Sequence, residues 1–218
     1  MGETAHRTTG AVVAAITALG IAACGDEPGS VTSESVLGRE IARSPELANS
    51  SFEEGALTPW HIAGRPYARF AVTRRLTWEG QHSLRIGALG RRVRGSVLVG
   101  QIAGGANAER GWRYRLVTRV RTLRLNRRVQ VEIKLIYDDD SFEFFLGRAV
   151  AGSPGLPESG TGIPAGTWRR WITVEANAVA KRQVEAVQVF AFDSGPGLLR
   201  GTVWIDSVEL SSREPRDG

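Results

Sequence analysis

The sequence has one cysteine, one methionine and two lysines among 218 residues. A single cysteine excludes a disulfide within one chain. Histidine is also scarce, and His61 and His82 are too far apart for a short-spaced metal motif. The hydrophobic core must therefore hold the domain together by itself, with a bound metal as its one available reinforcement.

Long apolar runs are lacking too, except at residues 11–19. That run follows the basic residue Arg7 and precedes Ile21-Ala22-Ala23-Cys24, and it is too short and too rich in alanine to span a bilayer core of about 30 Å. The order resembles a bacterial lipoprotein signal, whose cysteine becomes the lipidated first residue of the mature protein. We therefore predict a signal peptide over residues 1–23, lipidation of Cys24, and an exported protein anchored in the cell membrane or outer membrane. The alternative is a buried structural cysteine in an intracellular protein.

Basic residues exceed acidic ones, with 28 Lys and Arg against 23 Asp and Glu and a net charge of +5. A pI near 10.1 is compatible with nucleic-acid binding. Export argues against that function, and the arginines are scattered among carboxylates, with the densest group at Arg91-Arg92-Val93-Arg94. We therefore expect no nucleic-acid partner.

After the signal, the composition predicts a linker and one domain. Residues 24–45 are small and polar, as in a flexible spacer, residues 46–213 have the length of a single domain, and residues 214–218 form a tail. The 26 glycines favour a fold with many turns and short strands.

Period-two alternation, or enrichment in β-branched and aromatic residues, predicts strands at 115–122, 130–137, 186–192 and 203–210. Clusters of turn-forming residues separate such segments at 104–107, 138–140, 152–166 and 193–197. Residues 177–183 are the one stretch that could be helical. Together these signals predict an all-β, antiparallel β-sandwich.

Several segments, in order, resemble the carbohydrate-binding modules of the family 4, 9 and 22 type. They are Asn49-Ser50-Ser51-Phe52-Glu53-Glu54-Gly55 with Pro59-Trp60, Gly80-Gln81-His82-Ser83-Leu84-Arg85-Ile86, and Val203-Trp204-Ile205-Asp206-Ser207-Val208-Glu209-Leu210, with Trp112 and Trp168 in the expected order between the last two. The resemblance implies a jelly-roll β-sandwich with a galactose-binding-domain-like fold. It also implies that the domain binds a polysaccharide or another glycan.

The resemblance further implies a structural calcium ion where the first and last strands meet. Glu53 and Asp206 match the family's acidic positions, and carbonyl oxygens of residues 80–83 could complete the site, since calcium prefers several oxygen ligands. Ser207 stands where the family has a second aspartate. The alternative is that either acid pairs with one of the many arginines.

Aromatic rings and polar side chains are the candidate ligand-binding residues. Trp60, Trp168 and Trp204 match positions expected to pack the sandwich. The remaining candidates are aromatic residues in loops, polar residues on the solvent phase of the strands, and one position carried over from the family: Trp78, Trp112, Tyr137, Arg119, Arg121, Gln188 and Gln101. Glu132 and Lys134 lie on the same polar phase. The arginines suit an acidic glycan, such as a uronic-acid polymer. Each residue also has a simpler explanation in core packing, loop capping or cross-strand ion pairs.

No catalytic motif is present. Asp138-Asp139-Asp140 is typical of a turn, a glycosidase needs two carboxylates held across its substrate, and there is no Gly-x-Ser-x-Gly nucleophile motif. We therefore expect a lipoprotein that binds glycans and is not an enzyme. The alternatives are a protein-interaction or envelope-structural lipoprotein and, with less support, a polysaccharide lyase or hydrolase on a jelly roll.

Overall fold

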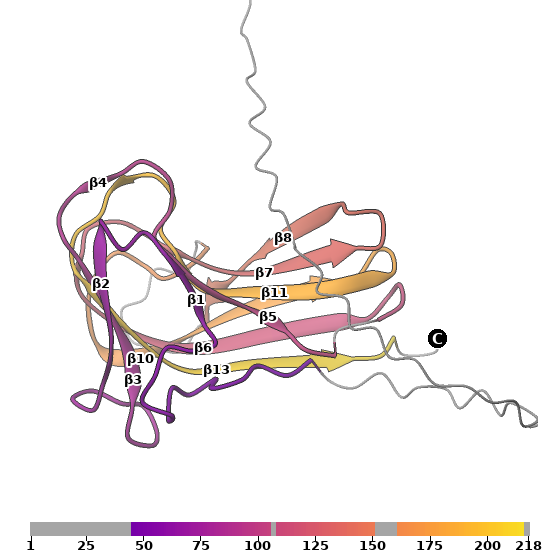
Figure 1. Cartoon of the computed structure of the whole chain (residues 1–218), viewed down its shortest axis with the longest axis horizontal. Helices are drawn as coiled ribbons and strands as arrows, with labels where there is room; N and C mark the ends of the chain where they lie inside the picture. The colour runs from indigo at the N-terminus through magenta and orange to yellow at the C-terminus, as the bar shows by residue number, and fades with distance from the viewer. Residues whose placement is uncertain (1–44, 106–107, 151–160, 216–218) are drawn as a thin grey trace, which may run out of the picture. The chain divides into compact units, whose positions relative to one another are not determined.

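The computed structural model describes residues 45–105, 108–150 and 161–215, and every regular element in these ranges is a β-strand (Figure 1). The strands pair antiparallel in two main sheets. The four strands predicted from the sequence are all present. The described residues contain no helix long and apolar enough to cross a membrane.

The five-stranded sheet has the order β1-β5-β11-β7-β8. Its strands are β1 (His61–Ala63), β5 (Leu98–Ala103), β11 (Val184–Asp193), β7 (Gln130–Tyr137) and β8 (Phe142–Leu146). The turn between β7 and β8 contains Asp138-Asp139-Asp140, as predicted.

The six-stranded sheet has the order β2-β3-β13-β6-β10-β9. Its strands are β2 (Ala68–Thr73), β3 (Ser83–Ala88), β13 (Thr202–Arg213), β6 (Arg113–Leu125), β10 (Gly166–Val179) and β9 (Arg148–Ala149). A further pair, β4 (Arg92–Val93) with β12 (Gly197–Leu198), lies at one end of the sandwich, and the β7–β8 turn lies at the other end (Figure 1).

The core lies between the two sheets, where alternate residues of each strand are fully buried. On β7 these are Val131, Ile133 and Leu135, and the six-stranded sheet contributes side chains such as Leu116 and Val174. Trp60 is buried and Trp168 packs against the core, as predicted. Trp204 is also buried, but it lies outside the core cluster and on the strand phase opposite to Val203 and Ile205.

The possible helix at residues 177–183 does not form. β10 continues to Val179, and Ala178 pairs with Tyr114 of β6. Ala176 and Ala178 are buried while Asn177 and Val179 are exposed. Pairing with β6 buries this alternating face and satisfies the backbone, which outweighs a weak local preference for helix.

Candidate functional site

The outer surface of the five-stranded sheet is the candidate ligand-binding site. Strand pairing sets three rows of outward residues across this surface: His61, Gly100, Phe190, Glu132 and Leu146; then Ile102, Gln188, Lys134 and Phe144; then Ala186, Ile136 and Phe142. We call these residues the five-stranded face. Residues that lie opposite each other on neighbouring strands are within contact distance, so successive residues of each row are neighbours in space.

The five-stranded face is unusually apolar for a solvent-facing phase. Ile102 is 62% exposed, Phe142 54% and Phe144 48%. The Phe142 and Phe144 ring centroids are 5.5 Å apart with an edge-on angle of 78°, and the Lys134 ammonium lies 4.3 Å from the Phe142 centroid. The ammonium lies over one face of the Phe142 ring in a cation–π contact, which orients both side chains.

Gly100 and Phe190 lie in the middle of this face, and both are buried. A Cβ at Gly100 would lie 2.9 Å from the Phe190 ring, so the ring occupies the space left by the glycine. Phe190 itself is only 9% exposed, and its ring centroid is 6.3 Å from that of Phe144. Phe190 of β11 and Phe144 of β8 therefore form an aromatic strip that crosses the intervening strand β7.

Glu132 lies in this strip, opposite both Phe190 and Leu146, and is 8% exposed. Burial, together with the nearby charge of Asp193, raises the pKa of the Glu132 carboxyl to about 7. A carboxyl group near half-protonation at neutral pH can either donate or accept a hydrogen bond.

An open hollow of about 730 Å³ adjoins the face at its β1–β5 side. Its lining includes His61, Ile102, Gln188 and Gln101. The Gln101 side chain, however, donates to the Ala48 carbonyl at 3.0 Å and accepts from the Ala48 N–H at 2.8 Å. Gln101 therefore fastens the segment before β1, while Gln188 and His61 lie on the outward phase.

The remaining predicted ligand residues do not share this face, which corrects the expectation of one polar sheet surface. Arg119 and Arg121 lie on β6 of the six-stranded sheet, whereas Gln188, Lys134 and Glu132 lie on the other sheet. The polar phase of a strand can be read from sequence, but the sheet to which the strand belongs cannot.

Arg119 and Trp78 come together on the six-stranded sheet. The Arg119 guanidinium lies 5.0 Å from the Trp78 ring centroid, and Trp78 is 48% exposed. Arg119 also donates to Thr173 Oγ1. Arg121 lies opposite Trp204, whose other neighbour in the sheet is Arg85. This sheet therefore presents arginine and indole groups in place of a phenylalanine strip.

Tyr137 and Trp112 are less available than predicted. Tyr137 is 1% exposed, and its hydroxyl donates to Glu143 at 2.8 Å, because the last residue of β7 points into the core. Trp112 is partly buried and packs against the core beside the turn at residues 109–111. Neither ring is presented on the five-stranded face.

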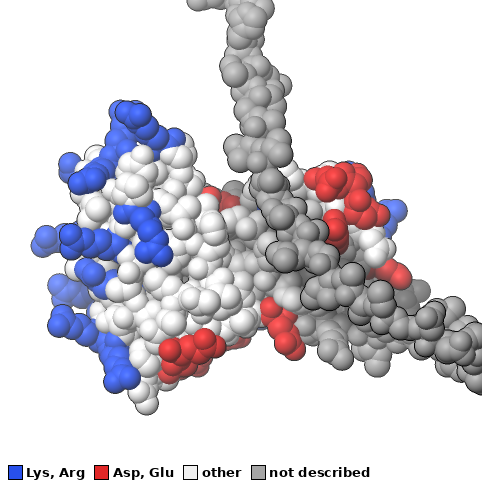
Figure 2. All heavy atoms as spheres, viewed as in Figure 1, with Lys and Arg blue, Asp and Glu red and all other residues white. Residues whose placement is uncertain are grey.

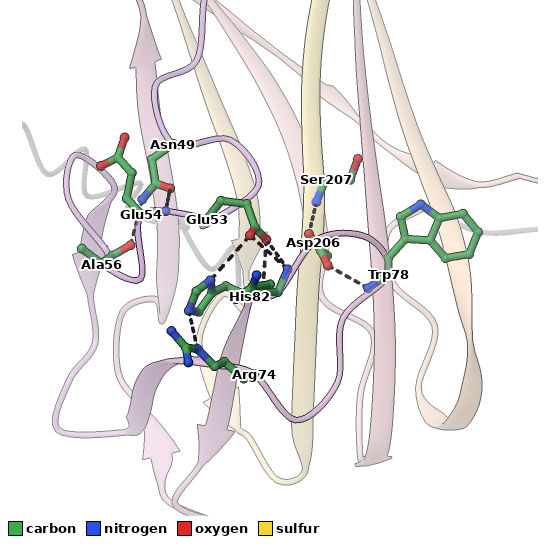
Figure 3. Close-up of polar contacts among 10 residues, drawn as sticks. Asn49, Glu53, Glu54, Ala56, Arg74, Trp78, His82, Asp206 and Ser207 are labelled. Carbon is green, nitrogen blue, oxygen red and sulfur yellow. Dashed lines mark hydrogen bonds and ion pairs between the residues drawn. The ribbon is translucent and has the colours of Figure 1, made fainter.

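Glu53 and Asp206 converge on the same loop from opposite ends of the chain (Figure 3). Glu53 accepts hydrogen bonds from the backbone N–H groups of Gln81 and His82 at 2.9–3.0 Å, and these bonds hold the pKa of its carboxyl below the usual value. Arg74 donates to His82 Nε2, which leaves His82 Nδ1 facing Glu53 at 3.6 Å. The loop thus presents N–H groups to Glu53, where the resemblance implied carbonyl oxygens.

Asp206 is fully buried and accepts hydrogen bonds from Trp78 N–H and Ser207 N–H at 2.8 and 2.7 Å. Burial raises the pKa of its carboxyl to about 6, and the charge of Glu79 adds to that effect. Carboxylate oxygens of both Glu79 and Glu209 lie 2.9 Å from Ser207 Oγ, which has one proton to donate.

The two acids fit a cation differently. Both Glu53 oxygens are already bonded to amides, so Glu53 is a poor metal ligand in this arrangement. Asp206 lies among negative charges that a cation would offset. Within the described ranges no three His, Cys, Asp or Glu side chains are grouped to hold a metal, so an ion here would need oxygens other than side-chain carboxylates alone.

Sequence reasoning missed the phenylalanines of β8. The signal was present, because Phe142-Glu143-Phe144-Phe145-Leu146 has apolar residues on both phases of a short strand. When both phases of such a strand carry apolar residues, only one phase packs in the core, and the apolar residues of the other phase face solvent or a ligand. Only the pairing of β8 with β7 identifies Phe142 and Phe144 as the outward set.

Comparisons with known proteins establish the fold. No protein-family profile and no curated protein matches the sequence. The CBM22-1 xylan-binding domain of Paenibacillus barcinonensis Xyn10C is 10% identical over 80% of this chain and 96% of that one, with a TM-score of 0.52. The Stig cyclase Fisc from Fischerella sp. TAU is 14% identical over 79% and 98%, with a TM-score of 0.54. The enzymatically active domain of bacteriophage CBA120 tailspike protein 4 is 11% identical over 78% and 21%, with a TM-score of 0.53.

These likenesses confirm the predicted jelly-roll sandwich of the carbohydrate-binding-module type. At identities of 10–14%, the similarity shows a shared fold and not a shared function. Because the same fold occurs in a cyclase, the fold does not decide between binding and catalysis, and function must be argued from the site.

Proposed function

We propose that this chain is a non-catalytic glycan-binding protein and that a polysaccharide lies across the five-stranded face. The observation that carries the proposal is the pair of half-exposed rings of Phe142 and Phe144 beside polar groups of the same face. A ring presents an apolar surface to the apolar face of a pyranose. Lys134, Gln188 and Glu132 supply a cation, an amide and a carboxyl group in neighbouring positions, which suits hydroxyl recognition.

Structural likeness supports the ligand class. The CBM22-1 domain of Paenibacillus barcinonensis Xyn10C, which has the same fold, binds xylan, a polysaccharide. Lys134 extends the range of ligands to mildly acidic glycans, because an ammonium group attracts carboxylates.

A glycan array probed with the full chain tests the proposal, followed by titration with the tightest glycan. Phe144→Ala is expected to weaken binding by about tenfold or more, equivalent to about 1.4 kcal/mol, because the stacking surface is lost. Leu123→Ala is the matched control, since Leu123 is 44% exposed on the six-stranded sheet. Trp78→Ala decides between the two sheets: a larger loss for Trp78→Ala than for Phe144→Ala would move the site to the six-stranded sheet.

A protein partner is the second candidate function. The exposed side chains of Ile102, Phe142, Phe144 and Leu146 form an apolar surface of the kind that protein interfaces cover. An array without any binding glycan, together with a partner whose binding is lost in Phe144→Ala, would favour this second function.

The proposal includes export and a lipid anchor. Residues 1–44 lie outside the described residues, so the support for lipidation of Cys24 is the sequence pattern alone. A tethered domain would hold its glycan near the cell surface.

We also retain a structural calcium ion beside Asp206 as a proposal. Its support is the buried carboxyl with Glu79 nearby, where a divalent cation would offset the negative charge. In this proposal Glu53 is not a calcium ligand. It accepts hydrogen bonds from Gln81 and His82 and so positions the loop that lies beside Asp206.

A further inference from the structure

Four loop segments far apart in the sequence meet at one end of the sandwich. Residues 64–67 join residues 89–95 through Leu89 N–H donating to the Tyr67 carbonyl at 2.9 Å. Residues 89–95 join residues 196–201 through the β4–β12 pair. Residues 196–201 join residues 124–128 through Arg200 N–H, which donates to Asn126 Oδ1 at 2.7 Å.

These segments carry arginine and no acidic residue. We call their eight arginines the arginine end: Arg65, Arg91, Arg92, Arg94, Arg124, Arg127, Arg128 and Arg200. Within the described ranges there are four ion pairs, and none of them involves these residues. Figure 2 shows basic side chains gathered at the end where β2 and β4 lie.

The arginine end is partly preorganised. The Arg91 guanidinium donates to the Pro66 carbonyl at 3.3 Å, Arg128 donates to the Thr161 carbonyl at 3.1 Å, and Arg127 donates to the Pro196 carbonyl. The other five arginines are exposed, and none of them forms an ion pair with a carboxylate of the described residues. Several unpaired cations at one end attract anions and repel one another, so an anionic partner lowers the electrostatic energy.

The position of the arginine end favours a partner other than the anchoring membrane. The described chain begins at Pro45, and Glu46 bridges Gly104, just after the last residue of β5. The arginine end adjoins the first residue of β5, Leu98. The first described residues therefore lie at the end of β5 opposite to the arginine end, so the membrane of the proposed anchor is not the partner that we assign to the arginines.

The arginine end also borders the five-stranded face. The outward residues Ala63, Leu98, Asp193 and Gln130 form a fourth row on the sheet, and each lies within a few residues of the arginine-bearing segments. A polymer on the five-stranded face would reach the arginines directly. Exposed aromatic rings, on which single-stranded nucleic acids stack, are absent from the four described segments, where Tyr67 is half-buried.

We propose that the arginine end binds an anionic polysaccharide, one that carries sulfate, phosphate or carboxylate groups. Guanidinium groups donate paired hydrogen bonds to such anions. The inference rests on the proposed function for the glycan nature of the polymer. It adds a second binding site beside the five-stranded face, and it requires the bound polymer to be anionic.

Binding of the full chain to dextran sulfate and to neutral dextran of equal length, at 50 and 300 mM NaCl, tests this inference. Dextran sulfate is expected to bind and to weaken strongly at the higher salt concentration, because exposed charges are screened. The variant Arg92→Gln/Arg94→Gln/Arg200→Gln is expected to weaken dextran sulfate binding by about tenfold, since three exposed ion pairs are lost. Thermal melting checks that the variant is folded.

The control variant, Arg75→Gln/Arg110→Gln/Arg213→Gln, removes the same charge from exposed positions elsewhere and should retain binding. Equal weakening in both variants, or no binding of dextran sulfate at 50 mM NaCl, would overturn the arginine end as a site. Tighter binding of a single-stranded DNA oligonucleotide than of dextran sulfate would overturn the polysaccharide assignment. Phe144→Ala should weaken binding of the neutral glycan selected on the array, whereas the arginine triple variant should weaken binding of dextran sulfate, so a failure of one proposal is distinguished from a failure of the other.

Discussion

At the scale of the residue, Gly80 allows Glu53 to hold its loop. Gly80 has a φ of +60°, and a Cβ at this position would clash with the Glu53 carboxylate. We expect Gly80→Ala to lower the free energy of unfolding by about 1–3 kcal/mol, because it adds backbone strain and displaces the carboxylate. Chemical denaturation measures the change.

Gly95→Ala is the matched control, since a Cβ at Gly95 meets no atom within 4 Å. An equal loss of stability in the two variants would mean that the Glu53 contact contributes nothing beyond the general effect of replacing a loop glycine.

Glu132 should make stability depend on pH. Its pKa rises from 4.5 to about 7 in the folded state, so between these values the folded chain holds a proton that the unfolded chain has released. The free energy of unfolding should therefore fall as pH rises from about 4.5 to about 7, by up to roughly 3 kcal/mol. Denaturation at several pH values measures this slope.

Glu132→Gln should flatten that slope, because the amide does not titrate. Asp206 also has a raised pKa and contributes in the lower part of the same range, so the comparison is made between wild type and variant at each pH. A variant with the wild-type slope would contradict the assignment to Glu132.

At the scale of the element, Gln101 connects the segment before β1 to β5. Its side chain bonds both backbone groups of Ala48, as a neighbouring strand would. We expect Gln101→Ala to increase hydrogen exchange at the Ala48 amide and to lower the melting temperature. Gln188→Ala, on the outward phase of β11, should leave both unchanged and affect glycan binding instead.

For the β8 strand, the sequence does not reveal which side chains point outward. Its outward Phe142 and Phe144 and its inward Phe145 are all phenylalanine, so polarity does not reveal the phase. The register with β7 sets it, since Lys134 lies opposite Phe144. Similarly, Arg119 and Gln188 both read as polar positions of alternating strands, and only strand order assigns them to different sheets.

At the scale of the whole molecule, a bound calcium ion would raise stability by mass action, because it binds the folded state. We expect a higher melting temperature in calcium than in chelator. Asp206→Asn should remove the difference by removing a charged ligand. Identical melting curves for the wild type in the two solutions would eliminate the structural cation.

The lipid anchor is also a property of the whole molecule. We expect the wild type to fractionate with membranes and Cys24→Ala to remain unprocessed or to become soluble. Stable anchoring needs two or more acyl chains, since one alone binds only marginally. Mass spectrometry of the mature N-terminus checks the site, and a free thiol at Cys24 with cleavage elsewhere would contradict it.

The sequence by itself determined the class of fold, because alternation along 115–122, 130–137 and 203–210 specifies strands with one buried face. The resemblance to carbohydrate-binding modules also implied that Glu53 and Asp206 lie near each other, and both acids bond the loop that contains Trp78 and Gln81. Only the tertiary structure decided which outward residues of different strands lie side by side on one surface. Alternation gives the phase of each strand, but the neighbours of a strand depend on pairing between distant segments, as for Phe144 beside Lys134 and for the arginines of four separate loops.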